Sequence, residues 1–273
     1  MNSIMKLKAW LFDIFKILLG ILMISPIMIA LIVSFMPKSD IYTSPFQLTL
    51  AHATFANYIE GFAYLKLGVY LKNTFVMLII QLPAQLLTAL LAAFAFSNFN
   101  FKGKNVLFAV LLTTMMIPGE VIQMTLYKMI MQWGLIDTYA GLTITGLTSV
   151  GAVFLFRQYM QTIPKELWEA ASIDGCGHMR YFGSILVPLC KTMIVTFSLR
   201  AFVTIYNNYM WPYLVTTKDS MRTVQTGVAM ISMNNHAGIT LAAATITSLI
   251  PLVVYFFGMD QIVEGMTAGA VKS

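Results

Sequence analysis

The sequence predicts an all-α integral membrane protein, and three observations carry that prediction. Of the 273 residues, 58% are hydrophobic and only 10% are charged, whereas a soluble domain carries charge on about 25% of its residues. Apolar stretches of about twenty residues recur along the chain, and each is long enough to cross a hydrocarbon core of ~30 Å. The lysines and arginines are scattered singly between these stretches. Positive charge beside membrane spans explains that pattern, and nucleic-acid binding, which needs a basic run with interleaved aromatics, is not expected.

Six transmembrane helices fit the apolar stretches and form a single transmembrane domain over residues 1–273. The first follows several lysines and is longer than a typical signal-peptide core, so we interpret it as an uncleaved span. Prolines lie inside several spans, which is tolerable where packed neighbours satisfy the freed carbonyls. The third span is interrupted at Pro118-Gly119-Glu120. The expected spans are 15–36, 72–97, 105–127, 138–156, 192–214 and 239–259, followed by a tail over 260–273.

The placement of lysine and arginine predicts the orientation, because these residues accumulate on the cytoplasmic side. With the N-terminus in the cytosol, the inner segments carry more of them than the outer segments do. An even number of spans then places the C-terminus in the cytosol as well. Two long segments, 37–71 and 216–238, lie outside in this topology, where they either meet an extracytoplasmic protein or form packed loops.

A polar island over residues 161–190 interrupts the apolar sequence on the cytosolic side. Pro164 suits the first position of a helix, where its missing N–H costs nothing. Gly175 suits the left-handed residue that ends a helix. The spacing i, i+3, i+4 and i+7 predicts one small, shallow helix face, which a groove of another protein could approach closely. That face comprises Leu167, Ala170, Ala171 and Asp174.

Residue patterns for catalysis and metal binding are missing from the sequence. The three histidines lie in different segments with no H-E-x-x-H pattern, and no G-x-x-x-x-G-K-[ST] phosphate loop occurs. Cys176 and Cys190 both lie in the polar island, where we expect reduced thiols rather than a disulfide or a metal site. The sequence therefore predicts a chain without catalytic residues, metal or cofactor, which neither binds nor hydrolyses ATP.

The polar island resembles the EAA loop of ABC-importer permeases. The resemblance rests on Glu169-Ala170-Ala171, Asp174-Gly175, Phe182, Ile185 and Pro188-Leu189, in that order and spacing. In that family the loop is the cytoplasmic coupling helix that docks on the ATPase subunit; an ordinary amphipathic connector is the alternative. The resemblance implies that the ATPase-coupling residues are Leu167, Glu169, Ala170, Ala171, Asp174 and Gly175.

The fifth expected span holds the densest polar chemistry in the membrane. Arg200, Thr204, Asn207 and Trp211 fall at i, i+4, i+7 and i+11, which predicts one continuous helical face flanked by Asn208. Amides can pair with sugar hydroxyls, and an indole offers a flat apolar surface to a sugar ring. The stretch from Asn207 to Pro212 resembles the W-N-x-x-x-W-P region of carbohydrate-class permeases, with Tyr206 in place of the first Trp. These residues either line a substrate pathway or hold helices together.

Arg200 departs from that family pattern, which usually has an apolar residue here. It lies nine residues after Lys191, about 13 Å along a helix, and a charge at such depth costs at least ~2.5–3.5 kcal/mol unless it meets water, a partner or a ligand. Arg200 therefore binds an anionic group of the substrate, pairs with an acidic residue of another subunit, or snorkels to the interface. Of the first two, we favour pairing and a neutral sugar.

The C-terminal tail resembles the E-G-x-T-A-G-A-V-K-G ending of maltose- and multiple-sugar-type permeases. The resemblance implies that the tail reaches between two ATPases through Gly265, Thr267, Gly269 and Lys272; a disordered tail is the alternative. Taken together, the motifs resemble the second, maltose-G-like membrane subunit of a bacterial carbohydrate ABC importer.

This resemblance implies a multi-pass protein of the bacterial cell membrane with a type I ABC importer fold. Its implied partners are a second homologous permease, two ABC ATPases that bind ATP and Mg²⁺, an extracytoplasmic solute-binding protein, a sugar or oligosaccharide, and membrane lipid. A permease for glycerol-3-phosphate or another anionic sugar derivative is the nearest alternative. A channel or an intramembrane enzyme is a distant one, since a channel needs no ATPase dock and an enzyme needs a catalytic cluster.

Overall fold

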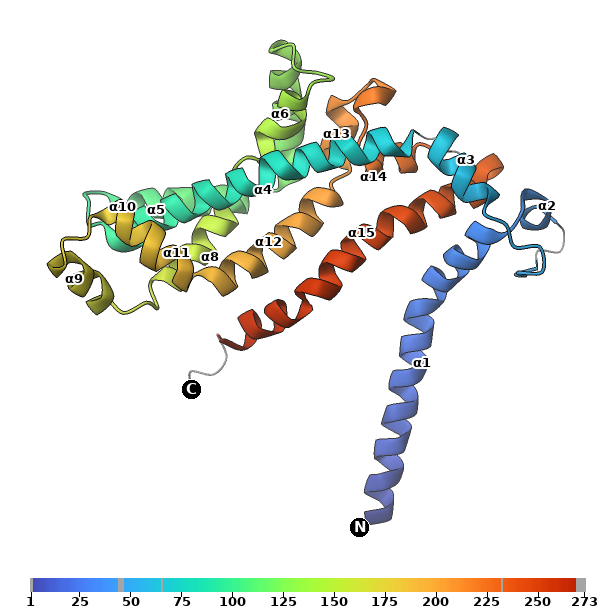
Figure 1. Ribbon diagram of the computed structural model, residues 1–273, viewed down its shortest axis with the longest axis horizontal. Helices are drawn as coiled ribbons and strands as arrows, with labels where there is room; N and C mark the ends of the chain where they lie inside the picture. Colours follow the sequence, from blue (N-terminus) through green and yellow to red (C-terminus); the bar gives the residue numbers. More distant parts are fainter. Residues whose placement is uncertain (1, 44–46, 65, 232, 269–273) are drawn as a thin grey trace. The chain divides into compact units, whose positions relative to one another are not determined.

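The computed structural model describes residues 2–43, 47–64, 66–231 and 233–268, and every regular element in these ranges is helical (Figure 1). The chain divides into two compact units, Met1–Gly68 with Val228–Leu249 and Val69–Gly227 with Ile250–Ser273. The helices are α1 (Asn2–Phe35), α2 (Lys38–Ile41), α3 (Ala56–Tyr64), α4 (Leu67–Asn98), α5 (Lys104–Thr113), α6 (Gly119–Gln132), α7 (Tyr139–Thr143), α8 (Val150–Met160), α9 (Glu166–Ile173), α10 (His178–Tyr181), α11 (Val187–Leu189), α12 (Lys191–Tyr206), α13 (Met210–Val215), α14 (Val224–Ala229) and α15 (Met233–Ala268). Short 3₁₀ helices η1 (Thr114–Met116), η2 (Ile144–Gly146) and η4 (Asp219–Met221) and the π-helix η3 (Phe182–Leu186) connect some of them.

In the first unit, α3 closes the end of α1. The Asn57 side chain is buried and donates hydrogen bonds to the carbonyls of Ser34 at 2.9 Å and Met36 at 2.8 Å. These carbonyls lie at the end of α1, where a helix leaves acceptors without intrahelical partners. Gly238 lies so close to this site that an added Cβ would come within 2.6 Å of Asn57 Nδ2. A glycine at 238 therefore lets α15 approach α3.

In the second unit, α4 packs against α8 and α12 over a continuous apolar core (Figure 1). Ala89 and Ala93 on α4 are fully buried, as is Phe156 on α8, and the rings of Phe156 and Phe197 meet edge-on at 5.6 Å. Large aromatic side chains of α8 and α12 thus fill the space beside the small residues of α4.

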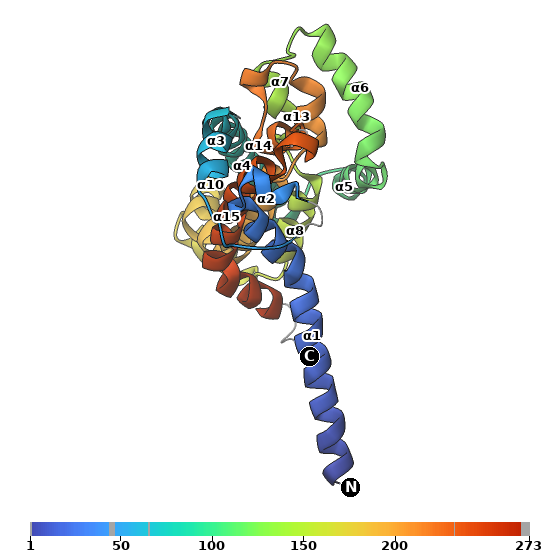
Figure 2. The ribbon, with the colours of Figure 1, turned by 90° about the vertical axis from the view of Figure 1, so that its right-hand side faces the viewer.

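Four helical stretches among the described residues are long and apolar enough to span a membrane without a sharp bend. They are Trp10–Phe35, Leu67–Asn98, Tyr139–Met160 and His236–Gly258. Two further candidates are bent pairs, Lys104–Met116 with Gly119–Gln132 at 95° and His178–Leu189 with Lys191–Tyr206 at 73°. Figure 2 shows the first of these bends, where α6 leaves α5 near a right angle. The count of six spans therefore includes two broken ones.

The break in the third span lies where the sequence predicts it. Ile117 is extended and Pro118 precedes the first residue of α6, because a proline lacks the N–H donor and disfavours helical geometry in the residue before it. The expected fifth span over 192–214 is not one continuous helix, since α12 stops at Tyr206 and α13 begins separately at Met210. Pro212 lies just after this break, and it has no N–H to donate to the carbonyl four residues earlier.

Two glutamines on α4, Gln81 and Gln85, pair with backbone carbonyls of the interrupted fourth span. Between α7 and α8 the helix is broken, which frees carbonyls inside a membrane segment. Gln81 donates to Thr143 O at 3.1 Å and Gln85 donates to Gly146 O at 2.7 Å. The free carbonyls are thus paired, as non-helical backbone at membrane depth requires.

Candidate functional site

The polar island folds into a short helix with a defined end. Helix α9 runs from Glu166 to Ile173, so it begins two residues after Pro164 rather than at it. At its end, Gly175 has φ 76°, the Gly175 N–H bonds to Ser172 O at 3.0 Å, and the Cys176 N–H bonds to Ala171 O at 2.9 Å. These two bonds form a Schellman motif, which satisfies the last carbonyls of the helix. The prediction for Gly175 is confirmed.

The exposed face of α9 differs from the expected one in one member. Ala171 is only 8% exposed and packs into the core of the second unit, so placing it on the outer face was wrong. Leu167 is 41% exposed and Ile173 is 87% exposed, and Ala170 and Asp174 are exposed as well. Trp168 accounts for the difference: it lies at i−3 from Ala171, and its large apolar surface turns that side of α9 inward.

An aromatic stack behind α9 fixes it to α10. The rings of Trp168 and His178 lie parallel with centroids 4.4 Å apart, and Trp168 meets Tyr181 edge-on at 5.1 Å. His178 also contacts Phe99, which follows α4, at 4.7 Å. These packed rings connect α9 to the segment that follows α4. Sequence reasoning missed Trp168 and His178, although the i, i+3 spacing of Trp168 and Ala171 already indicates a buried face.

The polar residues of the expected fifth span do not share one helical face. Arg200 and Thr204 lie on α12, Asn207 caps its end with φ −86° and ψ 4°, and Trp211 belongs to α13. Asn207 Oδ1 accepts a hydrogen bond from Gln225 at 3.1 Å. Trp211 is 4% exposed and donates from Nε1 to Gly141 O at 3.2 Å. The prediction of one continuous face is wrong, because the helix ends at Tyr206. Trp211 instead packs in the core and bonds to α7. Asn208 is half-buried in the segment that connects α12 to α13.

Arg200 borders a small cavity of about 130 Å³ in the second unit. Gln85, Thr204 and the N-cap residue of α8, Ser149, also line it, and none of its lining residues is acidic. The guanidinium side chain is exposed. The positive charge thus lies beside amide and hydroxyl groups, while the rest of the wall is apolar and formed by Gly151, Ala152, Phe197, Ala201 and Ile205.

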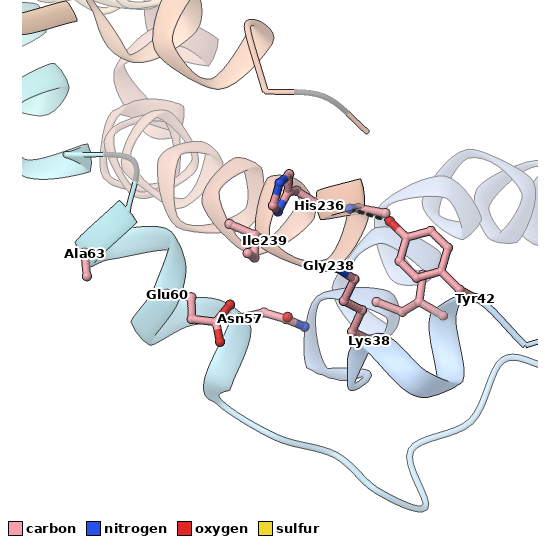
Figure 3. A pocket seen from close by; sticks show the side chains of 10 residues that line it. Lys38, Tyr42, Asn57, Glu60, Ala63, His236, Gly238 and Ile239 are labelled. Atoms are coloured by element: carbon pink, nitrogen blue, oxygen red, sulfur yellow. Dashed lines mark hydrogen bonds between the residues drawn. The ribbon is translucent and has the colours of Figure 1, made fainter. Parts of the chain in front are cut away.

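The first unit holds a larger cavity of about 520 Å³ between the two segments expected outside the membrane (Figure 3). Lys38, Tyr42 and Glu60 come from the first segment, and His236 and Gly238 come from the second. The hydroxyl of Tyr42 accepts a hydrogen bond from the Ala237 N–H at 3.2 Å, drawn in Figure 3. In this unit the two segments are packed on each other and present a mixed polar and apolar hollow.

Two of the four expected tail residues belong to the described part of the chain. Gly265 and Thr267 lie on the last turns of α15, while Gly269 and Lys272 lie outside the described residues. Among the described residues, no group of three or more His, Cys, Asp or Glu side chains is placed to hold a metal ion.

Comparison with known proteins finds a family whose sequence profile matches this chain. The sequence profile described as "Binding-protein-dependent transport system inner membrane component" matches residues 85–266. The sn-glycerol-3-phosphate transport system permease protein UgpE of Yersinia pestis is 32% identical over 93% of this chain and 95% of the relative. UgpE of Agrobacterium fabrum is 38% identical over 78% of each chain. The arabinooligosaccharides transport system permease protein AraQ of Halalkalibacterium halodurans is 28% identical over 97% of this chain and 96% of the relative.

A solved structure shares the fold. It is a bacterial ABC transporter involved in the import of the acidic polysaccharide alginate, and it superposes with a TM-score of 0.84 over 94% of this chain and 96% of that chain at 16% sequence identity. At that identity the likeness extends to the fold alone.

Proposed function

The chain belongs to the family of inner membrane components of binding-protein-dependent transport systems, and on that premise we propose its substrate, its partners and its coupling surface. As a permease subunit of an ABC importer it is a non-catalytic membrane protein of the inner membrane. We propose that it imports a sugar or oligosaccharide together with a second, homologous permease, each subunit forming half of the pathway. Two ATPases dock on the cytosolic side, and a solute-binding protein docks outside.

The coupling surface in this proposal is the outer face of α9. Leu167, Ala170 and Ile173 form an exposed apolar face with little side-chain bulk at its centre, and adjoining exposed apolar residues rimmed by polar ones are typical of a surface that meets another protein. Glu169 and Asp174 add polar contacts at the rim. Gly175 and the stack of Trp168 on His178 hold the helix rigid, so that a movement of the ATPase displaces α9 as a body rather than bending it.

The mechanism is alternating access. ATP binding closes the two ATPases, α9 follows them, and the packed rings pass the displacement to α4 and the core helices, which opens the pathway outward to the loaded binding protein. Hydrolysis returns the inward-facing state. The tail residues Gly265, Thr267, Gly269 and Lys272 reach between the ATPases in this proposal. The cavity of the first unit then belongs to the surface that meets the binding protein.

A phosphorylated or otherwise anionic sugar derivative is the second candidate substrate. The cavity beside Arg200 favours it, because an exposed cation lies there among amide and hydroxyl groups with no acidic lining residue. The names of two relatives, which carry sn-glycerol-3-phosphate, point in the same direction. AraQ, named for arabinooligosaccharides, supports the neutral class.

The test of the proposed function is uptake by the assembled transporter in proteoliposomes. With the cognate permease, ATPases and binding protein present, labelled neutral oligosaccharides and labelled glycerol-3-phosphate are offered separately. We expect ATP-dependent uptake of one class, and no ATPase activity from the purified chain alone. Hydrolysis by the chain alone, or transport by the chain as a homo-oligomer, would overturn the proposal.

A further inference from the structure

Two adjoining cavities form a polar cleft where α4 ends, α5 and α9 begin, and α8 ends. Their volumes are about 600 Å³ and 530 Å³, and Asn100, Lys104 and Gln161 line both. The cleft lies on the side that the sequence predicts to be cytosolic, at the level where the spans end. Of the residues that line the cleft, only Glu169 also belongs to the proposed coupling surface.

Three cations gather around this cleft. Lys104 lines both cavities. Arg157 lines the smaller cavity, in which no acidic residue takes part, and Lys165 lines the larger one, where Glu169 is the acidic member. Positive charges brought together without matching carboxylates destabilise each other unless an anion joins them.

The protein holds two of these cations in place. Arg157 lies over the ring of Phe108, with Cζ 4.0 Å from the centroid, and its Nε donates to Phe96 O at 3.4 Å. The Lys104 ammonium donates to Phe99 O at 2.7 Å. Both side chains are therefore pre-ordered, and a ligand that binds them loses little free energy to side-chain ordering.

The N-terminus of α5 opens into the smaller cavity. Gly103, the N-cap residue, has φ 81° and supplies no side-chain cap, and Asn105 and Val106 of the first turn line the cavity. The first N–H groups of a helix need acceptors from outside it, and the positive end of the helix dipole favours an anion there. An anion in the cleft would therefore meet the first N–H groups of α5 as well as the three cations and the amides of Asn100 and Gln161.

The neighbouring surface of α5 is apolar and exposed. Val106 is 68% exposed, Leu107 56% and Val110 57%, all on the membrane segment that starts at the cleft. We propose that the cleft binds the phosphate headgroup of an anionic phospholipid of the inner leaflet, with Lys104, Arg157 and Lys165 as its cationic contacts and the acyl chains lying along α5. A water-soluble phosphate would use the same cations without contacting the apolar surface of α5.

The experiment is native mass spectrometry of the full chain in detergent, titrated with phosphatidylglycerol or phosphatidylcholine. We expect preferential retention of phosphatidylglycerol. Arg157→Gln and Lys165→Gln should each weaken its binding about fivefold, the effect of one basic residue near an anionic headgroup. Lys102→Gln is the matched control, because it removes one positive charge from the nearby segment between α4 and α5 without lining the cleft, and it should leave binding unchanged.

A charge-retaining variant and a soluble competitor test the alternative explanations. Arg157→Lys retains the charge and should restore most of the binding, which a variant that merely loses packing against Phe108 would not do. Soluble glycerol phosphate at millimolar concentration should fail to displace the lipid; displacement would overturn the lipid in favour of a cytosolic phosphate. Equal binding of the two lipids, or an equal loss in Lys102→Gln, would overturn the site itself. None of these readouts depends on which substrate is transported.

Discussion

The carboxylate of Asp137 accepts hydrogen bonds from both the N–H and the hydroxyl of Thr217, a residue 80 positions further along the chain. The Lys218 N–H adds a third bond at 2.8 Å, and the Asp137 N–H donates to Val215 O at 3.0 Å. The connection between α6 and α7 is thereby clamped to the segment after α13. Asp137 has φ 58°, a left-handed geometry that aspartate tolerates better than most residues.

Asp137→Asn should destabilise the second unit by ~1 kcal/mol, since it replaces bonds to a charged acceptor by neutral ones. Burial alone would raise the pKa of Asp137, but the bonds from Thr217 and Lys218 outweigh it and hold the pKa below its usual value. A folded-state pKa below the unfolded one stabilises the fold above the unfolded pKa of ~3.9, and this contribution is lost as the pH falls through the folded pKa. The difference in thermal midpoint between wild type and variant should therefore shrink below about pH 4. A difference that is constant with pH would contradict this, and Glu60→Gln, an exposed carboxylate of the other unit, serves as control.

Gly175→Val should uncouple transport from ATP hydrolysis while leaving the chain inserted. The positive φ of Gly175 costs a residue with a side chain ~1–2 kcal/mol, so the Schellman motif that fixes the end of α9 is weakened. Gly177→Val is the matched control, because Gly177 has φ −75° and an added Cβ would meet no atom within 4 Å. Uptake and stimulated ATPase activity are measured together. Near-normal transport by the Gly175 variant would refute the assignment of α9 as the dock.

Ile173→Glu should weaken ATPase assembly, because a charge replaces the most exposed apolar side chain of α9. Ser172→Glu adds the same charge one position earlier, about 100° around the helix, and should have the smaller effect. The yield of ATPase co-purified with the chain is the measurement. Equal losses in both variants would point to charge alone and against a specific face.

Arg200→Leu separates the two interpretations of the intramembrane charge. If an anionic substrate meets Arg200, uptake should fall while the assembly is recovered in full, and Asn207→Ala should only weaken uptake. If a carboxylate of the other permease pairs with it, the variant leaves that carboxylate buried and unpaired, and the assembly should weaken by ~3–5 kcal/mol. Complex yield and uptake for this variant distinguish the cases. An Arg200→Leu variant unchanged in both would leave a snorkelling side chain as the remaining explanation.

Asn73→Leu should destabilise the second unit more than any surface change. Asn73 is 1% exposed, donates to Ser220 O and Arg222 O at 2.9 Å each, and accepts from the Tyr139 hydroxyl at 2.7 Å. Each buried group left without a partner costs ~1–3 kcal/mol. A lowered thermal midpoint in detergent is the expected result. Lys72→Leu, the exposed neighbour on α4, is the control and should change the midpoint little.

The parts of the fold set by local chemistry were predictable from the sequence. Pro118 breaks the third span and Gly175 ends α9 because each residue restricts or permits particular backbone angles on its own. The end of α12 at Tyr206 was missed although Pro212 signals it, because helical spacing from Arg200 to Trp211 was taken as one face. The inward turn of Ala171 and the roles of Trp168 and Asn73 depend on which elements meet in three dimensions, and spacing along one helix does not contain that information.

The glutamines that pair with the broken fourth span also set an order for making the protein. Gln81 lies on α4, and its acceptor, Thr143 O, is synthesised 62 residues later. At 5–20 residues per second the acceptor follows after roughly 3–12 s, and in that interval the amide would face hydrocarbon if α4 had already moved into lipid. We therefore expect α4 to stay beside the insertion machinery until α7 emerges, so that the two enter the bilayer as a pair. The hydrogen bonds that stabilise the mature core therefore also constrain the order in which these helices insert.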